Sequence, residues 1–62
     1  MMIIVIEFIE ETSQRFRAIE IQAESVPDES MYPATRRLLQ ESGERPSRIM
    51  KIYQPKQKGS AS

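Results

Sequence analysis

Apolar side chains occupy both alternating sets of positions between Met2 and Ile9. The even positions are all apolar, and the odd positions are apolar except for Glu7. A β-branched run that is apolar on both faces is typical of a strand in the middle of a sheet, and we expect such a strand here. The run is too short for a membrane span and has no basic segment before it, so we expect neither a membrane span nor a signal peptide.

Strict alternation follows in residues 15–25. The apolar side chains point one way and the polar side chains the other: Ile19, Ile21 and Ala23 against Glu20, Gln22 and Glu24. This pattern indicates a half-buried strand. Because the polar segment 11–14 supplies turn residues, residues 1–25 are predicted to form an antiparallel hairpin.

A helix is predicted after Pro27, which cannot continue a strand ladder. Asp28 or Ser30 can cap its first N–H groups, Pro33 is tolerated in its first turn, and Gly43 is a typical residue after a helix end. The stripe expected to face the sheet consists of Met31, Ala34 and Leu38 with Thr35 or Leu39. The opposite side of the helix carries polar residues: Arg36, Arg37, Gln40 and Glu41.

Residues 47–54 predict a third strand, closed by Pro55. Met50 and Ile52 are expected on one face of it, and Ile49, Lys51 and Tyr53 on the other. A right-handed crossover makes this strand parallel to the second, and the most apolar strand takes the centre. The prediction is an α+β domain over residues 1–55, arranged β-β-α-β with strand order 2-1-3 and one helix on one face. A flexible polar tail is expected over residues 56–62.

One helix can cover only one face of such a sheet. Expected on the uncovered side are Ile3, Val5 and Ile9, with Ile49 or Tyr53. An exposed apolar patch of this kind marks a contact surface for a partner or a second copy. The alternative is that the tail or a bent hairpin folds over it.

The chain of 62 residues contains no Cys and no His. Disulfides and the usual zinc ligand sets are therefore excluded, so a core this small is expected to gain stability by association. The usual general base and thiol nucleophile are missing, and Glu10 and Glu11 point to opposite faces of a strand. With Gly43 and Gly59 as the only glycines, there is no phosphate-binding loop. We expect a non-enzymatic protein without cofactor or metal, and a chain without Cys is compatible with the cytoplasm.

Charge is divided along the chain. Residues 1–31 carry seven acidic and two basic side chains, a balance of −5, and residues 32–62 carry seven basic and two acidic side chains, a balance of +5. Either the halves neutralise each other, or a two-faced molecule meets a charged partner in one orientation. Nucleic-acid binding is the alternative, although the acidic half would have to face away from a polyanion. Its phosphate contacts would be Arg36, Arg37, Arg45, Arg48, Lys51, Lys56 and Lys58, with Tyr53 stacking on a base.

Two stretches carry a resemblance: "RFRAIEIQAES" leading into a capped helix, and "RPSRIMKIYQP" as the closing strand. Their order resembles the small bacteriophage proteins that bind and inhibit bacterial RNA polymerase. The resemblance implies polymerase contacts by Arg48 and Lys51 on the third strand and by Glu20 and Glu24. The β-β-α-β plan is also similar to small linker domains of cyanobacterial light-harvesting assemblies. Both resemblances imply a binding module without catalysis.

The sequence therefore predicts a protein-binding module, acting as a dimer or as an inhibitory or accessory subunit of a bacterial complex such as RNA polymerase. Its predicted partner-binding residues are Ile3, Val5, Glu20, Glu24, Arg48, Lys51 and Tyr53. The alternatives are a small nucleic-acid-binding protein and a linker subunit of an assembly.

Overall fold

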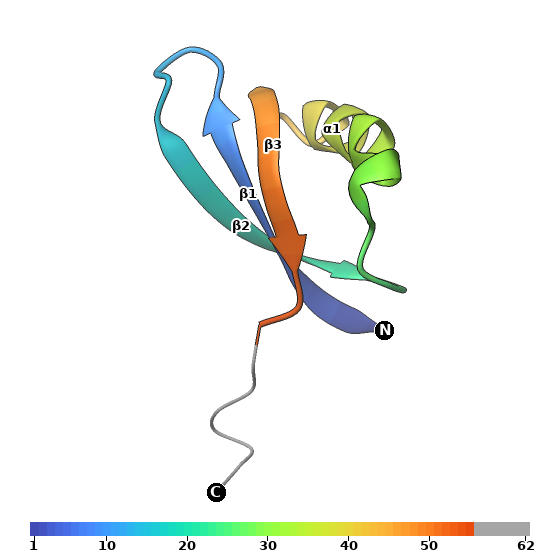
Figure 1. Ribbon diagram of the computed structural model, residues 1–62. Coiled ribbons are helices and arrows are strands. Elements are labelled where there is room, and N and C mark those ends of the chain that lie inside the picture. Colours follow the sequence, from blue (N-terminus) through green and yellow to red (C-terminus); the bar gives the residue numbers. More distant parts are fainter. Residues whose placement is uncertain (56–62) are drawn as a thin grey trace, which may run out of the picture.

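The computed structural model describes residues 1–55 and contains a three-stranded sheet with a helix on one face (Figure 1). Its elements are β1 (Met2–Glu10), β2 (Phe16–Ala23), the 3-10 turn η1 (Glu29–Met31), α1 (Tyr32–Glu41) and β3 (Pro46–Tyr53). The strand order is β2-β1-β3, which confirms the predicted α+β fold with a central first strand. Both outer strands run antiparallel to β1 and therefore share one direction, as expected. The predicted tail lies outside the described residues.

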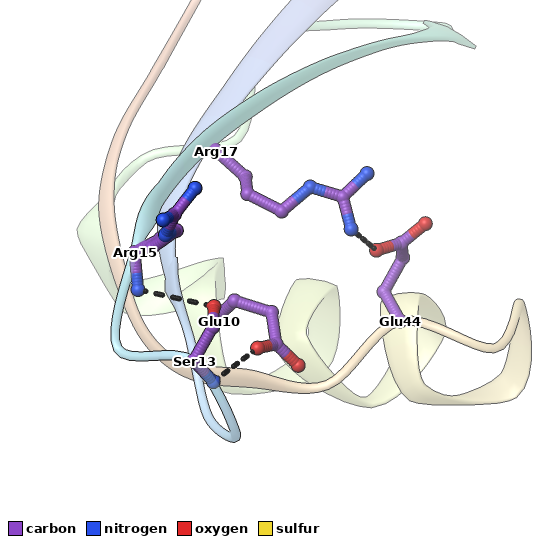
Figure 2. A network of polar contacts seen from close by, with 5 residues as sticks. All are labelled: Glu10, Ser13, Arg15, Arg17 and Glu44. Atoms are coloured by element: carbon purple, nitrogen blue, oxygen red, sulfur yellow. Dashed lines mark hydrogen bonds and ion pairs between the residues drawn. The ribbon is translucent and has the colours of Figure 1, made fainter.

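The turn between β1 and β2 is held by hydrogen bonds around Glu10. The Glu10 amide donates to the Arg15 carbonyl, and the Gln14 amide donates to the Glu10 carbonyl, each at 2.8 Å. The Ser13 amide donates to the Glu10 carboxylate at 2.6 Å, and the Arg15 amide donates to the Ser13 hydroxyl at 3.3 Å (Figure 2). The Ser13 amide is the main reason why the pKa of Glu10 is lowered. These bonds close the hairpin in a single register that continues along its whole length.

The register between β3 and β1 shifts twice, and the first shift changes which side chains face the helix. Ile49 lies opposite Phe8 and packs against the core. The prediction that Ile49 shares a face with Lys51 is wrong, because Met50 is an extra residue that reverses the alternation of side chains. The prediction that Met50 and Ile52 share one face of the strand is wrong for the same reason, since Met50 is 45% exposed and Ile52 is buried.

The core lies between α1 and the face of β1 that carries its even-numbered residues. Its buried members are Ile4, Ile6, Phe8, Leu39 and Ile52. Partly buried side chains pack around them: Met2, Ile19, Ile21, Ala23, Tyr32 and Ile49. Within residues 1–55, every buried side-chain nitrogen or oxygen has a hydrogen-bond partner, so this small core carries no desolvation penalty from unpaired polar groups.

The helix turns a different stripe toward the sheet than the pattern predicts. The side chains that face the core are Tyr32, Thr35 and Leu39. Thr35 and Leu39 are the two optional members of the predicted stripe, whereas its principal members Met31, Ala34 and Leu38 are exposed. The two stripes have the same spacing and differ by one residue, which is a rotation of about 100°. Thr35 is tolerated in the buried stripe because its hydroxyl donates to the Met31 carbonyl at 3.1 Å.

The predicted helix-end signals are confirmed in part, because Asp28 caps η1, whereas α1 itself has no side-chain cap at its N-terminus. The Asp28 carboxylate accepts from the Ser30 amide at 3.1 Å, which caps η1 at the entry to α1. Pro33 lies in the first turn of α1. At the other end Gly43 has φ +97, and the amides of Gly43 and Glu44 donate to the carbonyls of Gln40 and Leu39. This pair of bonds is a Schellman motif, which needs a residue in the left-handed region.

Candidate protein-docking face

The face of the sheet opposite α1 is called the open face below. In Figure 1 the helix lies on the other side of the sheet, and no other helix or strand of residues 1–55 covers the open face. Its central row comes from β1: Ile3, Val5, Glu7 and Ile9. Its flanks are Phe16, Ala18, Glu20 and Gln22 from β2 and Arg48, Lys51 and Tyr53 from β3. Six of the seven predicted partner-binding residues therefore lie on the open face by register: Ile3, Val5, Glu20, Arg48, Lys51 and Tyr53.

The apolar centre of the open face is partly covered by its own neighbours. Val5 pairs with Glu20 on one side and with Tyr53 on the other. Although no helix covers it, Val5 is only 7% exposed. Ile3, the other predicted apolar contact, is half-buried beside Gln22. These two residues form the floor of the face rather than its outermost surface.

A polar cluster lies next to Val5. Glu7 is opposite Lys51, whose ammonium lies 5.0 Å from the centroid of the Tyr53 ring, a cation–π distance. The pKa of the Tyr53 phenol is raised, first by its hydrogen bonding with Glu7, then by burial and by the negative charges of Glu7 and Glu20. The shift is away from physiological pH, where a tyrosine phenol is neutral in any case and can donate a hydrogen bond.

The most exposed apolar side chain of the open face is Phe16, which the sequence pattern did not predict as a contact. Phe16 pairs with Ile9, and Ile9 pairs with Arg48 on its other side. Phe16 is 58% exposed, so a large aromatic ring lies beside a half-buried Ile9, with Arg48 on the far side of β1. The signal that could have found it is the alternation of side chains, because Phe16 and Glu20 are four positions apart on one strand and must share a face.

The two flanks of the open face carry opposite charges. Glu20 lies on β2, and Arg48 and Lys51 lie on β3. Glu24 is exposed and follows the end of β2, so it lies outside the paired part of the sheet. A partner seated on this face meets negative charge on one side and positive charge on the other, and such an arrangement favours one orientation over its reverse.

The other basic residues of the second half do not join Arg48 and Lys51. Arg36 lies on α1, behind the sheet, and its Nε donates to the Pro46 carbonyl at 2.9 Å. Arg37 is also on α1, beside a shallow hollow lined by Pro33 and Ala34. Arg45 lines a second open hollow at the end of α1, with Glu11, Gln40, Gly43 and Glu44. Lys56 and Lys58 lie outside the described residues. A continuous basic surface for phosphates is therefore not formed by residues 1–55.

Two other features are absent from the described part of the chain. Residues 1–55 contain no group of three His, Cys, Asp or Glu side chains that could hold a metal ion. No helix within the same residues is long and apolar enough to cross a membrane.

Comparison of the chain with protein-family models, with curated proteins and with solved structures gives no match. The resemblance in element order to bacteriophage inhibitors of RNA polymerase stays a prediction, as does the similarity to linker domains. The candidate site therefore rests on the geometry of this chain.

Proposed function

We propose that this chain is a protein-docking module that binds its partner through the open face. The observation that carries the proposal is the exposed Phe16 ring beside Ile9, on a face without a covering element and between flanks of opposite charge. Aromatic side chains and Arg are enriched in protein interfaces, where apolar burial supplies affinity. Charges at the rim then set the orientation of the partner.

The complementary partner surface follows from these positions. It presents an apolar side chain or cleft to Phe16 and Ile9, acidic groups to Arg48 and Lys51, and a basic group to Glu20. Bacterial RNA polymerase is the candidate target, because the resemblance in element order implies it. In that case the chain acts as an inhibitory or accessory subunit, and Arg48 and Lys51 are its principal polar contacts.

The test is binding of the fluorescently labelled chain to purified bacterial RNA polymerase, measured by anisotropy. Phe16→Glu is expected to weaken binding by about a hundredfold, because it replaces a contact ring by an unpaired charge. Leu38→Glu is the matched control, since Leu38 is 51% exposed but belongs to α1 on the other side of the sheet. Equal losses from both variants would contradict docking through the open face.

If the chain does not bind RNA polymerase, that enzyme is excluded as the target, and the docking face is tested by a second experiment. A photo-crosslinking residue at position 16 is then compared with one at position 38 in a bacterial lysate. The proposal expects a discrete protein adduct from position 16 only. Adducts from neither position, or equally from both, would count against the open face as a docking surface.

The nucleic-acid alternative predicts a different set of results. Binding to DNA or RNA would fall steeply with salt and would be lost in the double variant Arg48→Glu with Lys51→Glu. Phe16→Leu, which keeps the apolar character but removes the ring, would leave phosphate binding unchanged. Protein docking instead expects the same Phe16→Leu change to weaken binding measurably, because the ring itself is the contact.

A further inference from the structure

The sheet has two free edges, and they differ. β3 is interrupted by two register shifts and begins at Pro46. Bulges and Pro are the features by which proteins prevent an edge strand from pairing with another chain. β2 pairs with β1 in one unbroken register over eight residue pairs and contains neither Pro nor Gly. Of the two edges, β2 is the one that can accept another strand.

The backbone groups at the β2 edge can be assigned from the hairpin turn. Glu10 and Arg15 continue the register of the hairpin, and the Glu10 amide donates to the Arg15 carbonyl. In an antiparallel pair, alternate residues exchange both hydrogen bonds with the neighbouring strand. The odd-numbered residues of β2 therefore bond to β1. The N–H and C=O groups at the free edge belong to the even-numbered residues, Phe16, Ala18, Glu20 and Gln22.

We propose that a second copy of this chain pairs with β2 in antiparallel fashion, about a twofold axis at Ile19. Ile19 is the midpoint of the four edge residues, so this register gives every one of their backbone groups a partner. Phe16 pairs with Gln22 of the second copy, and Ala18 pairs with Glu20. The result is a continuous six-stranded sheet, and the twofold axis is perpendicular to it.

Side chains favour this register over its neighbours. Shifting the axis to Glu20 places two like charges directly opposite each other, which is destabilising. With the axis at Ile19, Glu20 meets the small Ala18, and the half-buried Ile19 meets its own copy on the helix side of the sheet. The charged Arg17 does not block the edge, because its guanidinium is held by Glu44 at 3.0 Å and lies 5.9 Å from the centroid of the Phe8 ring.

The pairing also changes the proposed docking surface. Because the axis is perpendicular to the sheet, both open faces lie on the same side of the dimer. The Glu20 side chains of the two copies lie near the axis, and Arg48 and Lys51 lie on the two outermost strands. The dimer thus presents an acidic centre between two basic margins, with Phe16 in both halves. The pairing itself does not depend on the proposed function, because it uses the edge and not the face.

The first measurement is the solution mass of the chain by light scattering over a range of concentrations. A dimer of twice the 7.2 kDa chain mass is expected. Ala18→Pro removes an N–H at the free edge without removing a bond to β1, and it is expected to raise the dimer dissociation constant by at least about tenfold. Ala18→Val keeps the N–H and is the matched control, expected to leave the dimer unchanged. A monomer at every concentration would overturn the proposal.

Cross-linking tests the register and does not depend on how well Ala18→Pro folds. The chain has no Cys, so a single introduced thiol is the only one present. Ile19 faces its own copy at a non-hydrogen-bonded pair, where the Cα separation of about 4.5 Å permits a disulfide. Ile19→Cys is expected to form a covalent dimer under mild oxidation, and Ile21→Cys, which faces Arg17 of the second copy, is expected to remain uncross-linked. Cross-linking at position 21 but not at 19, or at neither position, would overturn the twofold pairing at Ile19. If the chain stays monomeric but still binds its partner, the proposed dimer is wrong and the proposed docking function stands.

Discussion

Phe8 and Phe16 lie on opposite faces of one hairpin and have opposite surroundings. Phe8 is 0% exposed in the core beneath α1, whereas Phe16 is 58% exposed on the open face. Burying a Phe side chain contributes roughly 1.5 to 3 kcal/mol, and an exposed ring contributes little of this. The covered face of the sheet therefore supplies the stability of the fold. On the open face Val5 is also buried, but exposed side chains such as Phe16 contribute little to stability and are available for contact with a partner.

The largest expected effect is the difference in stability loss between replacing the Phe8 ring and replacing the Phe16 ring. Phe8→Ala is expected to lower the free energy of unfolding by about 3 to 5 kcal/mol, because it leaves a cavity in the core. A chain of this length has a total stability of roughly 3 to 9 kcal/mol, so this variant is expected to be partly unfolded. Phe16→Ala is expected to change the same quantity by less than about 0.5 kcal/mol. Urea denaturation followed by circular dichroism measures both, and a large loss from Phe16→Ala would remove the distinction between the two faces.

The next comparison is between two neighbours on β3. Ile49 packs against the core because Met50 forms the bulge beside it, and Met50 is 45% exposed. Ile49→Ala is expected to lower the free energy of unfolding by about 1 to 2 kcal/mol, since the residue is half-buried. Met50→Ala is expected to change it by less than about 0.5 kcal/mol. The reverse order would mean that β3 pairs without the bulge and that Ile49 belongs to the open face.

A smaller effect is expected from the ion pair at the margin of the covered face. Arg17 Nη1 and Glu44 Oε1 are 3.0 Å apart, and the two side chains are 47% and 25% exposed, respectively (Figure 2). A double-mutant cycle with Arg17→Ala and Glu44→Ala is expected to give a coupling of about 0.2 to 1 kcal/mol. The coupling is expected to decrease as salt is raised, because exposed charges are screened. A coupling that does not respond to salt would indicate packing of the Arg17 side chain over Phe8 in place of charge attraction.

The smallest expected effect is a pH dependence on the open face. The pKa of Tyr53 is raised above its ordinary value of 10.0, chiefly by Glu7. The folded phenol holds its proton more tightly than the unfolded one, and this difference stabilises the folded state. The stabilisation is fully present below pH 10.0 and is lost as pH rises through the raised pKa. Denaturation experiments at increasing alkaline pH should show a decline in the free energy of unfolding. This decline is expected to be smaller in Tyr53→Phe and in Glu7→Gln. An unchanged decline in Glu7→Gln would mean that this carboxylate does not hold the phenol proton.

Local patterns predicted most of the architecture. β1 is apolar on both faces, and a strand of this composition is stable only between two others. The alternation in β2, the cap at Asp28, Pro33 in the first helical turn and Gly43 at the helix end each depend on a few adjacent residues. Such signals are readable without knowledge of the partners across the fold.

The candidate site was only partly predictable. Glu20, Lys51 and Tyr53 reach the open face as expected, because alternation decides this in β2 and in the part of β3 that follows Met50. The exposure of Phe16 was not predicted, because it depends on what covers the ring and not on its position in the strand. Val5 was placed on the correct face, but its burial was not predicted, because it depends on the neighbours that β2 and β3 bring beside it.

The sequence by itself determined the number, type and order of the elements and the central place of β1, because these depend on apolar periodicity and on residues with strong backbone preferences. Only the tertiary structure decided the bulge at Met50 and the rotation of α1. The stripe of Met31, Ala34 and Leu38 and the stripe of Tyr32, Thr35 and Leu39 have the same spacing. Packing against the sheet selected the second, with Arg36 held to the Pro46 carbonyl beside it. Spacing along one element cannot rank such alternatives, because their free energies differ only in contacts with residues elsewhere in the fold.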